Sequence, residues 1–77
     1  MNKIVVQKDF AYLYLNKDFY QEDIIWGVLP VYQDFFETKI QVFGNYYVLK
    51  IKSKEEEYSN ELLANEFANY LISEMHK

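Results

Sequence analysis

The chain contains no cysteine and no arginine, and it has only one proline, one histidine and two glycines. The absence of cysteine excludes disulfides, thiolate catalysis and cysteine-ligated zinc. A domain without such cross-links is typical of the cytoplasm, where we expect this protein to act. No apolar run approaches the length of a membrane span, and Ile4–Val6 is too short for a signal-peptide core. We therefore expect no membrane association.

The charged residues exclude further functions. All eight cationic side chains are lysine, and twelve acidic residues bring the net charge to −4 at pH 7. Proteins that read nucleic acid usually contact phosphates and base edges with arginine in a basic patch, so no nucleic-acid partner is expected. An acidic mimic of nucleic acid is also disfavoured, because the charge is small and lysines are interspersed among the acids.

Few residues are suited to catalysis. His76 is one residue from the C-terminus, where fraying makes a catalytic base or metal ligand hard to hold. The carboxylates of Glu22–Asp23 and Glu55–Glu57 fall on polar segments, whereas general acid–base catalysis requires a desolvated carboxyl group. No serine has a base at a recognisable spacing, and there is no glycine-rich phosphate loop. The sequence therefore predicts no enzyme, no cofactor and no metal site.

Apolar and aromatic residues are abundant instead. Hydrophobic residues make up 51% of the 77 residues, and eight tyrosines, six phenylalanines and one tryptophan make up 19%. Large aromatic side chains can supply a dense core in a domain this small. We expect a single globular domain, residues 1–77.

The first part of the chain predicts β-structure followed by a helix. Apolar and aromatic residues alternate over residues 10–15, as in a strand with both faces partly covered. Ile4–Val6 forms either a separate strand, with a turn at residues 7–9, or part of one bulged strand. Over residues 18–36, Asp18 and Gln21 match a capping box, and the apolar residues form one helical arc.

That apolar arc consists of Ile24, Ile25, Val28, Leu29, Tyr32, Phe35 and Phe36. Pro30 falls on the polar arc, where a kink would bend the helix around the core. The alternative is a break at Leu29, with Pro30 opening a second short helix.

The second part of the chain predicts a hairpin and a last helix. Residues 38–53 alternate around Gly44-Asn45, a plausible two-residue turn because both residues tolerate positive φ. Ser53 and Glu56 match a capping box for a helix from about Lys54 to Met75.

The expected architecture is a two-layer β-α-β-β-α sandwich of the α+β class. Two amphipathic helices would cover one face of a mainly antiparallel sheet of three or four strands. One sheet face and both sheet edges would remain open, and open edges invite pairing with another chain.

Aromatic residues are the first candidates for partner binding. Trp26 falls on the polar arc of the first helix, and tryptophan is enriched at interface centres. An exposed tryptophan can equally lie flat over the helix surface. Four tyrosines lie on the predicted strands, namely Tyr12, Tyr14, Tyr46 and Tyr47, and some of them must point to the sheet face away from the helices. They either pack within the sheet or form an aromatic face for a partner or a second copy.

The last helix contains a second candidate surface. Opposite its apolar arc, a stripe recurs at spacings of three and four residues and consists of Tyr58, Leu62, Asn65, Asn69, Ile72 and His76. Such a stripe is commonly a solvated helix back with chance apolar residues. The alternative is a contact surface in which asparagine fixes the register.

The order of these motifs resembles that of HxsD-like proteins, the small accessory proteins of His-Xaa-Ser peptide maturation systems. Tyr20 precedes an acidic, isoleucine-rich helix start (YQEDII), the hairpin closes in VLKIKSK, and the last helix contains NEFANYLI. The family's acid-Phe-x-Asn-hydrophobic-Leu motif is matched by Glu66, Phe67, Asn69, Tyr70 and Leu71. The chain departs from the family at Ile24, where alanine is usual, and at residues 73–75, where an Asp and an Arg commonly follow.

The resemblance implies a non-catalytic accessory protein that binds a precursor peptide, a radical-SAM maturase, or both. Metal clusters would belong to the maturase, because this chain has no cysteine to hold an iron–sulfur cluster. An open sheet edge could accept an extended leader peptide as an added strand. The alternative function is a self-associating structural or regulatory module, in which the aromatic sheet face or the last helix forms a two-fold homodimer interface.

Overall fold

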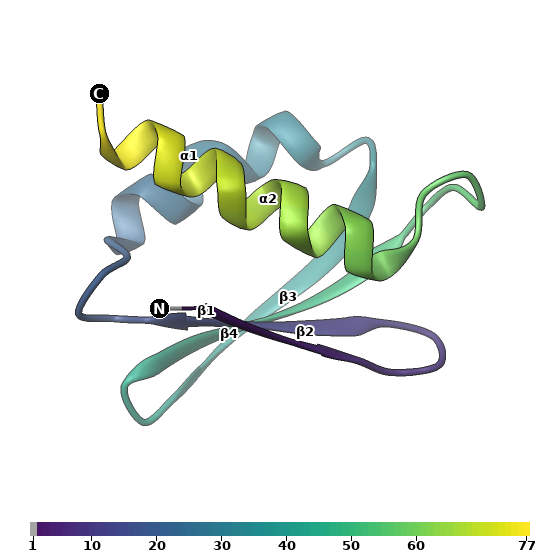
Figure 1. Cartoon of the computed structure of the whole chain (residues 1–77), viewed down its shortest axis with the longest axis horizontal. Helices are drawn as coiled ribbons and strands as arrows, with labels where there is room; N and C mark the ends of the chain where they lie inside the picture. The colour runs from purple at the N-terminus through teal and green to yellow at the C-terminus, as the bar shows by residue number, and fades with distance from the viewer. Residues whose placement is uncertain (1) are drawn as a thin grey trace.

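The computed structural model describes residues 2–77 and contains two β-hairpins, each followed by a helix (Figure 1). The elements are β1 (Asn2–Val6), β2 (Ala11–Asn16), α1 (Glu22–Tyr32), β3 (Phe36–Phe43), β4 (Tyr46–Ser53) and α2 (Asn60–Met75). Residues 4–6 therefore belong to a separate strand and not to a bulged β2. The expected α+β fold is confirmed, with four strands and the order β-β-α-β-β-α.

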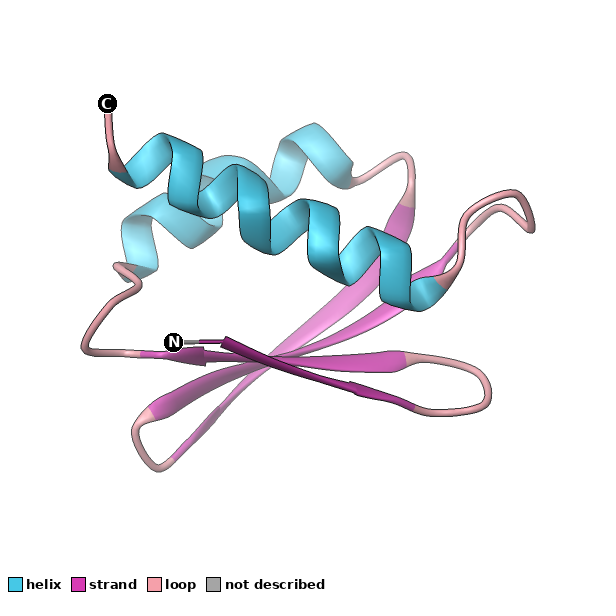
Figure 2. Cartoon of the chain, viewed as in Figure 1, coloured by secondary structure: helices cyan, strands magenta, loops and turns pink. Residues whose placement is uncertain are grey.

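The four strands form one antiparallel sheet in the order β1-β2-β4-β3. The two central strands come from different hairpins, and Leu13 of β2 lies opposite Leu49 of β4. β1 and β3 are the two edge strands. Both helices lie on the same side of the sheet, and the other side is uncovered (Figure 2).

The core fills the space between the sheet and the helices. Its fully buried strand residues include Leu13, Leu15, Leu49 and Ile51. Phe67 of α2 is also fully buried, and its ring makes edge contacts with Tyr32 at 5.5 Å and Phe36 at 5.7 Å between centroids. Large aromatic side chains thus fill the junction of both helices with the sheet, as the composition predicts.

The predicted limits of the first helix are wrong at both ends. Asn16 forms a turn in which its side chain accepts a hydrogen bond from the Asp18 N–H at 2.8 Å and its carbonyl accepts from the Tyr20 N–H at 3.0 Å. This turn occupies residues that the capping box would need, so α1 begins at Glu22. Phe36 is buried as expected, but it is the first residue of β3.

Pro30 lies inside α1 and is exposed, so the alternative of a helix break at Leu29 is wrong. The apolar arc faces the core through Ile25 and Val28, which are buried. A proline on the solvent side leaves the freed carbonyl accessible to water, which limits the cost of the missing hydrogen bond.

The predicted start of the second helix is also wrong. α2 begins at Asn60, where the Ser59 hydroxyl caps it by accepting a hydrogen bond from the Leu62 N–H at 3.0 Å. Ser53 is the last residue of β4 and is paired with Phe36. The apolar arc predicted for this helix consists of Leu63, Ala64, Phe67, Ala68, Tyr70, Leu71 and Met75. Of these residues, Leu63, Ala64, Phe67, Ala68 and Leu71 are buried, whereas Tyr70 is 37% exposed.

The predicted turn at Gly44-Asn45 is confirmed by the pairing of Phe43 with Tyr46. Gly44 has φ of +59°, and no other residue among 2–77 has positive φ. Positive φ at the first central residue alone fits a type II′ turn. The Asn45 side chain donates to the Asn16 side chain at 3.2 Å and to the Asp18 carboxylate at 3.1 Å, which ties this turn to the end of β2.

Candidate functional site

The outer side of β3 is an open edge of eight residues. Successive side chains of a strand point to opposite faces of the sheet. The side chains of β3 on the helix side are Phe36, Thr38, Ile40 and Val42, and those on the open face are Glu37, Lys39, Gln41 and Phe43. In antiparallel pairing every second residue directs its backbone N–H and C=O away from the neighbouring strand. The edge therefore offers a row of donors and acceptors to a further strand.

A hollow of about 460 Å³ lies between α1 and the helix side of β3, and we call it the edge groove. Trp26, Leu29 and Pro30 of α1 line one wall, and Phe36 and Thr38 of β3 line the other. Trp26 is 55% exposed, and its indole N–H donates to the Glu22 carboxylate at 3.3 Å. The edge groove is thus a mostly apolar slot beside unpaired strand backbone.

A second hollow, of about 370 Å³, lies at the same stretch of β3 on the open face, and we call it the lysine hollow. Its charged residues are Glu37, Lys39, Lys50 and Lys52. The register places Lys39 opposite Lys50 and Glu37 opposite Lys52. Glu37 and Thr38 line both hollows, so the two flank the same point of the edge. The lysine hollow is cationic in a chain whose net charge is −4.

The predicted residues Tyr12 and Tyr14 lie on the open face of β2. Their rings belong to a chain of edge-to-face contacts that runs from Phe10 through both residues to Tyr46, with centroid separations of 5.0, 6.4 and 6.1 Å. Val48, which lies opposite Tyr14, is only 8% exposed although it is on the uncovered face. The tyrosines therefore form a small packed layer of their own while each keeps part of its surface in solvent.

The other predicted residues lie apart from this face. Asn69 is exposed on α2, and the Asn65 amide donates to the Glu61 carbonyl of its own helix at 3.0 Å. Leu62 is 44% exposed, whereas Tyr58 precedes α2 and packs its ring against Phe35 with centroids 6.1 Å apart. Ile72 of the predicted stripe is partly buried against the core. The candidate residues thus occupy separate surfaces, and Trp26 is the one that lines the edge groove.

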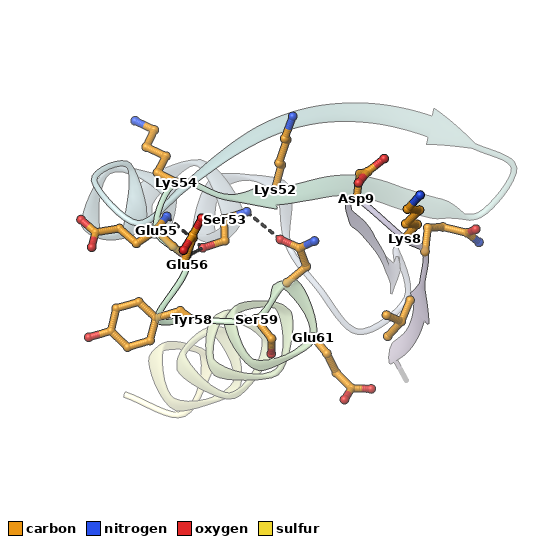
Figure 3. Close-up of a pocket in the computed structure, with 13 residues that line it drawn as sticks. Lys8, Asp9, Lys52, Ser53, Lys54, Glu55, Glu56, Tyr58, Ser59 and Glu61 are labelled. Carbon is orange, nitrogen blue, oxygen red and sulfur yellow. Dashed lines mark hydrogen bonds between the residues drawn. The ribbon is translucent and has the colours of Figure 1, made fainter.

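A third hollow, of about 710 Å³, lies where the β1–β2 turn meets the start of α2 (Figure 3). Its charged rim mixes both signs, with Lys8, Lys52 and Lys54 beside Asp9, Glu55, Glu56 and Glu61. The Ser53 hydroxyl donates to the Glu55 carbonyl at 2.6 Å, and the Ser59 hydroxyl caps α2. The serine oxygens at this hollow are therefore engaged in local structure, and its balanced charge favours no particular ligand.

Tyr20, which is buried, and Tyr32, which is partly buried, both have a raised pKa. Burial raises the pKa of Tyr20, whose hydroxyl has no hydrogen-bond partner among the described residues. Burial, with the nearby Glu66 carboxylate, raises the pKa of Tyr32, whose hydroxyl donates to the Glu66 carbonyl at 3.4 Å. Both phenols therefore stay neutral at physiological pH and serve the core. Tyr20 and Phe67 of the resemblance motifs are accordingly packing residues, whereas Asn69 is exposed.

Within residues 2–77 no three His, Cys, Asp or Glu side chains gather as a metal site would require. Neither helix is long and apolar enough to cross a membrane. Sequence reasoning did not identify Lys39, Lys50 and Lys52, although the predicted two-residue turn already places Lys39 opposite Lys50. Comparisons of the chain with protein-family models, with curated proteins and with solved structures find no match.

Proposed function

We propose that the chain is a non-catalytic accessory protein of a peptide maturation system and that it holds an extended precursor peptide for a radical-SAM maturase. The observation that carries this proposal is the open edge of β3, which runs for eight residues beside the edge groove. The resemblance of the YQEDII and NEFANYLI segments to HxsD-like proteins supplies the class of partner.

The physical basis of the proposal is strand addition. A peptide that pairs with β3 gains main-chain hydrogen bonds, and its alternate side chains can enter a neighbouring pocket. Val42 and Phe43 are 61% and 75% exposed at the end of β3, so the edge also offers apolar contact area. Long exposed edges are usually protected in soluble proteins, and a peptide partner gives this edge a function.

The test titrates a precursor peptide of a radical-SAM maturation system into the isotope-labelled chain. Strand addition predicts amide shift changes along Glu37–Val42 and at the Trp26 indole. Trp26→Ala, which removes a wall of the edge groove, should weaken binding without unfolding the chain because the side chain is half exposed. Tyr58→Ala, an aromatic truncation outside the groove, is the matched control. Shift changes confined to the helices, or none, would refute strand addition.

The open aromatic face favours one alternative, a homodimeric interaction module. Tyr12, Tyr14 and Tyr46 form a continuous aromatic row on an uncovered sheet face. A second copy packed there by two-fold symmetry would bury this row. Sedimentation at increasing concentration tests the alternative: a dimer that Tyr14→Ser dissociates supports it, and a chain that stays monomeric at high concentration excludes it.

A further inference from the structure

The hollows on the two sides of the β3 edge differ in chemistry. On the helix side, the apolar residues Trp26, Leu29, Pro30 and Phe36 line the edge groove. Gln33 and Lys54 also line it, and the Lys54 ammonium donates to the Gln33 carbonyl at 2.6 Å. On the open face, three lysines and one glutamate line the lysine hollow. Because Thr38 and Glu37 line both, one strand laid along this edge would have the apolar hollow on one side and the cationic hollow on the other.

Because side chains alternate along a strand, the positions of the two hollows determine which residues of an added strand would face each hollow. Residues i and i+2 of an added strand face one side of the sheet, and residue i+1 faces the other. Side chains on the helix side would meet the edge groove and the apolar row that continues through Ile40 and Val42. Side chains on the open face would lie beside Lys39, with Lys50 on the next strand.

We infer that the β3 edge selects an extended peptide in which apolar residues alternate with acidic residues. The inference rests on the proposed function and specifies its ligand. Charge complementarity assigns the acidic positions, since carboxylates on this face would lie beside Lys39 and Lys50, which are paired across the two strands. The Lys50 ammonium lies over the Phe10 ring, 4.3 Å from its centroid, on the same face. An acidic peptide is repelled by the acid-rich remainder of this chain. The lysine hollow therefore favours binding at the β3 edge, with the acidic side chains of the peptide on the open face of the sheet.

Nucleic acid is the less suitable anion for this site. The open-face rings lean edge-to-face on one another, from Phe10 to Tyr46, whereas base stacking requires accessible ring faces. The lysine hollow also contains Glu37, which a continuous phosphate backbone would have to pass. A peptide can place a neutral or cationic side chain at that point.

The experiment compares three synthetic peptides, each acetylated and amidated. The first is Ser-Val-Glu-Val-Glu-Ile-Ser, the second replaces both glutamates by lysine, and the third groups the same residues as Ser-Val-Val-Ile-Glu-Glu-Ser. Amide shifts of the labelled chain report the position of binding and its affinity. We expect the first peptide to shift β3 amides and to bind about tenfold more tightly than either of the others at low salt, with the charge preference shrinking as salt is added.

Charge-reversal variants assign the preference to the lysine hollow. Lys39→Glu should reverse the order of the glutamate and lysine peptides. Lys3→Glu is the matched control, because Lys3 lies on the same sheet face opposite Tyr14 but at the other edge. Equal effects of the two variants would overturn the inference, because they would indicate a response to net charge alone.

Backbone and competitor controls complete the test. Methylating alternate backbone nitrogens of the first peptide should abolish binding, since it removes main-chain donors needed for strand addition. Equal binding of all three peptides, shifts at β1 in place of β3, or a thymidine oligonucleotide that shifts the lysine-hollow amides when the peptide does not would each overturn the inference.

The outcomes also separate the ligand rule from the proposed function. If a precursor peptide binds β3 while the three probes bind alike, the function stands and the apolar–acidic rule fails. If the probes follow the rule and the precursor peptide does not bind, the site stands and the proposed function fails.

Discussion

Lys39 of β3 lies directly opposite Lys50 of β4 on the uncovered face of the sheet. Like charges at opposed cross-strand positions are destabilising, whereas opposite charges contribute about 0.2–1 kcal/mol. The next pair on the same face, Glu37 and Lys52, is complementary. The register of the hairpin therefore places two like charges opposite each other in the lysine hollow, beside two opposite charges. The Lys50 ammonium lies over the Phe10 ring, 4.3 Å from its centroid.

Lys39→Glu should raise the free energy of unfolding by about 0.5 kcal/mol, because it converts this repulsion into an attraction. Urea unfolding followed by circular dichroism measures the change. Lys39→Gln removes the repulsion without adding an ion pair, so its free energy of unfolding should lie between those of the parent chain and Lys39→Glu. A loss of stability in Lys39→Glu would contradict the cross-strand register.

The two glycines of the chain should respond in opposite directions to substitution by alanine. Gly44 has φ of +59°, so Gly44→Ala should lower the free energy of unfolding by about 1 kcal/mol through backbone strain. Gly27 lies inside α1, so Gly27→Ala should raise it by about 1 kcal/mol. An added Cβ meets no atom within 4 Å at either position, so both effects come from the backbone. Thermal unfolding of the two variants measures the effects. Changes of the same sign in the two unfolding temperatures would contradict the assigned conformations.

Tyr20→Phe should leave stability at pH 7 equal or raise it by up to about 1 kcal/mol, because the buried hydroxyl it removes makes no hydrogen bond. Burial raises the folded-state pKa of Tyr20 above its ordinary value of 10.0. The folded chain thus retains this proton more strongly than the unfolded chain, and stability is lost as the pH rises above 10.

The variant should therefore lose less stability than the parent chain between pH 7 and pH values above 10. Urea titrations at both pH values measure the difference. Tyr58→Phe, at an exposed tyrosine, should reproduce the alkaline loss of the parent. Marked destabilisation of Tyr20→Phe at pH 7 would show that the hydroxyl is hydrogen bonded.

Asn69→Ala should leave the chain folded and raise the free energy of unfolding by about 0.5 kcal/mol, because Asn69 is exposed within α2 and alanine favours helix. Calorimetry checks stability, and sedimentation with a maturase checks binding. Weakened binding in the folded variant would assign a contact surface to the outer side of α2. Undiminished binding would show that the outer side of α2 makes no contact with the partner. Unfolding of the Asn69→Ala variant would contradict the exposure of Asn69.

Local patterns predicted the elements of this fold better than their limits. Gly44-Asn45 predicted its turn because a two-residue hairpin needs positive φ. Alternation over residues 10–15 predicted a strand, and in the structure Leu13 and Leu15 are on its buried face. The predicted first residues of both helices were wrong, because other local interactions involve the predicted capping residues. Asn16 forms a turn across the residues before α1, and pairing with Phe36 retains Ser53 in the sheet. Capping-box spacing alone does not distinguish a cap from a residue that a neighbouring element already holds.

The sequence could predict the kind of candidate site, an open sheet edge, but it could not predict which strand forms that edge. An open sheet edge follows from the small number of strands, but which strand lies at the edge depends on β2 pairing with β4, a contact between distant segments. Lys39, Lys50 and Lys52 were predictable as neighbours from the turn. Their position beside the groove under Trp26 was not, because it depends on where α1 crosses the sheet.

The central place of β2 and β4 also has a kinetic consequence. Each hairpin joins residues that are close in sequence, so it can close on a microsecond scale. The core forms only when β2 meets β4 across the intervening α1 and β3, a closure with a larger entropic cost. We expect that meeting to limit the folding rate. Between the two events the hairpins expose apolar faces, and in that interval the chain is most prone to aggregation.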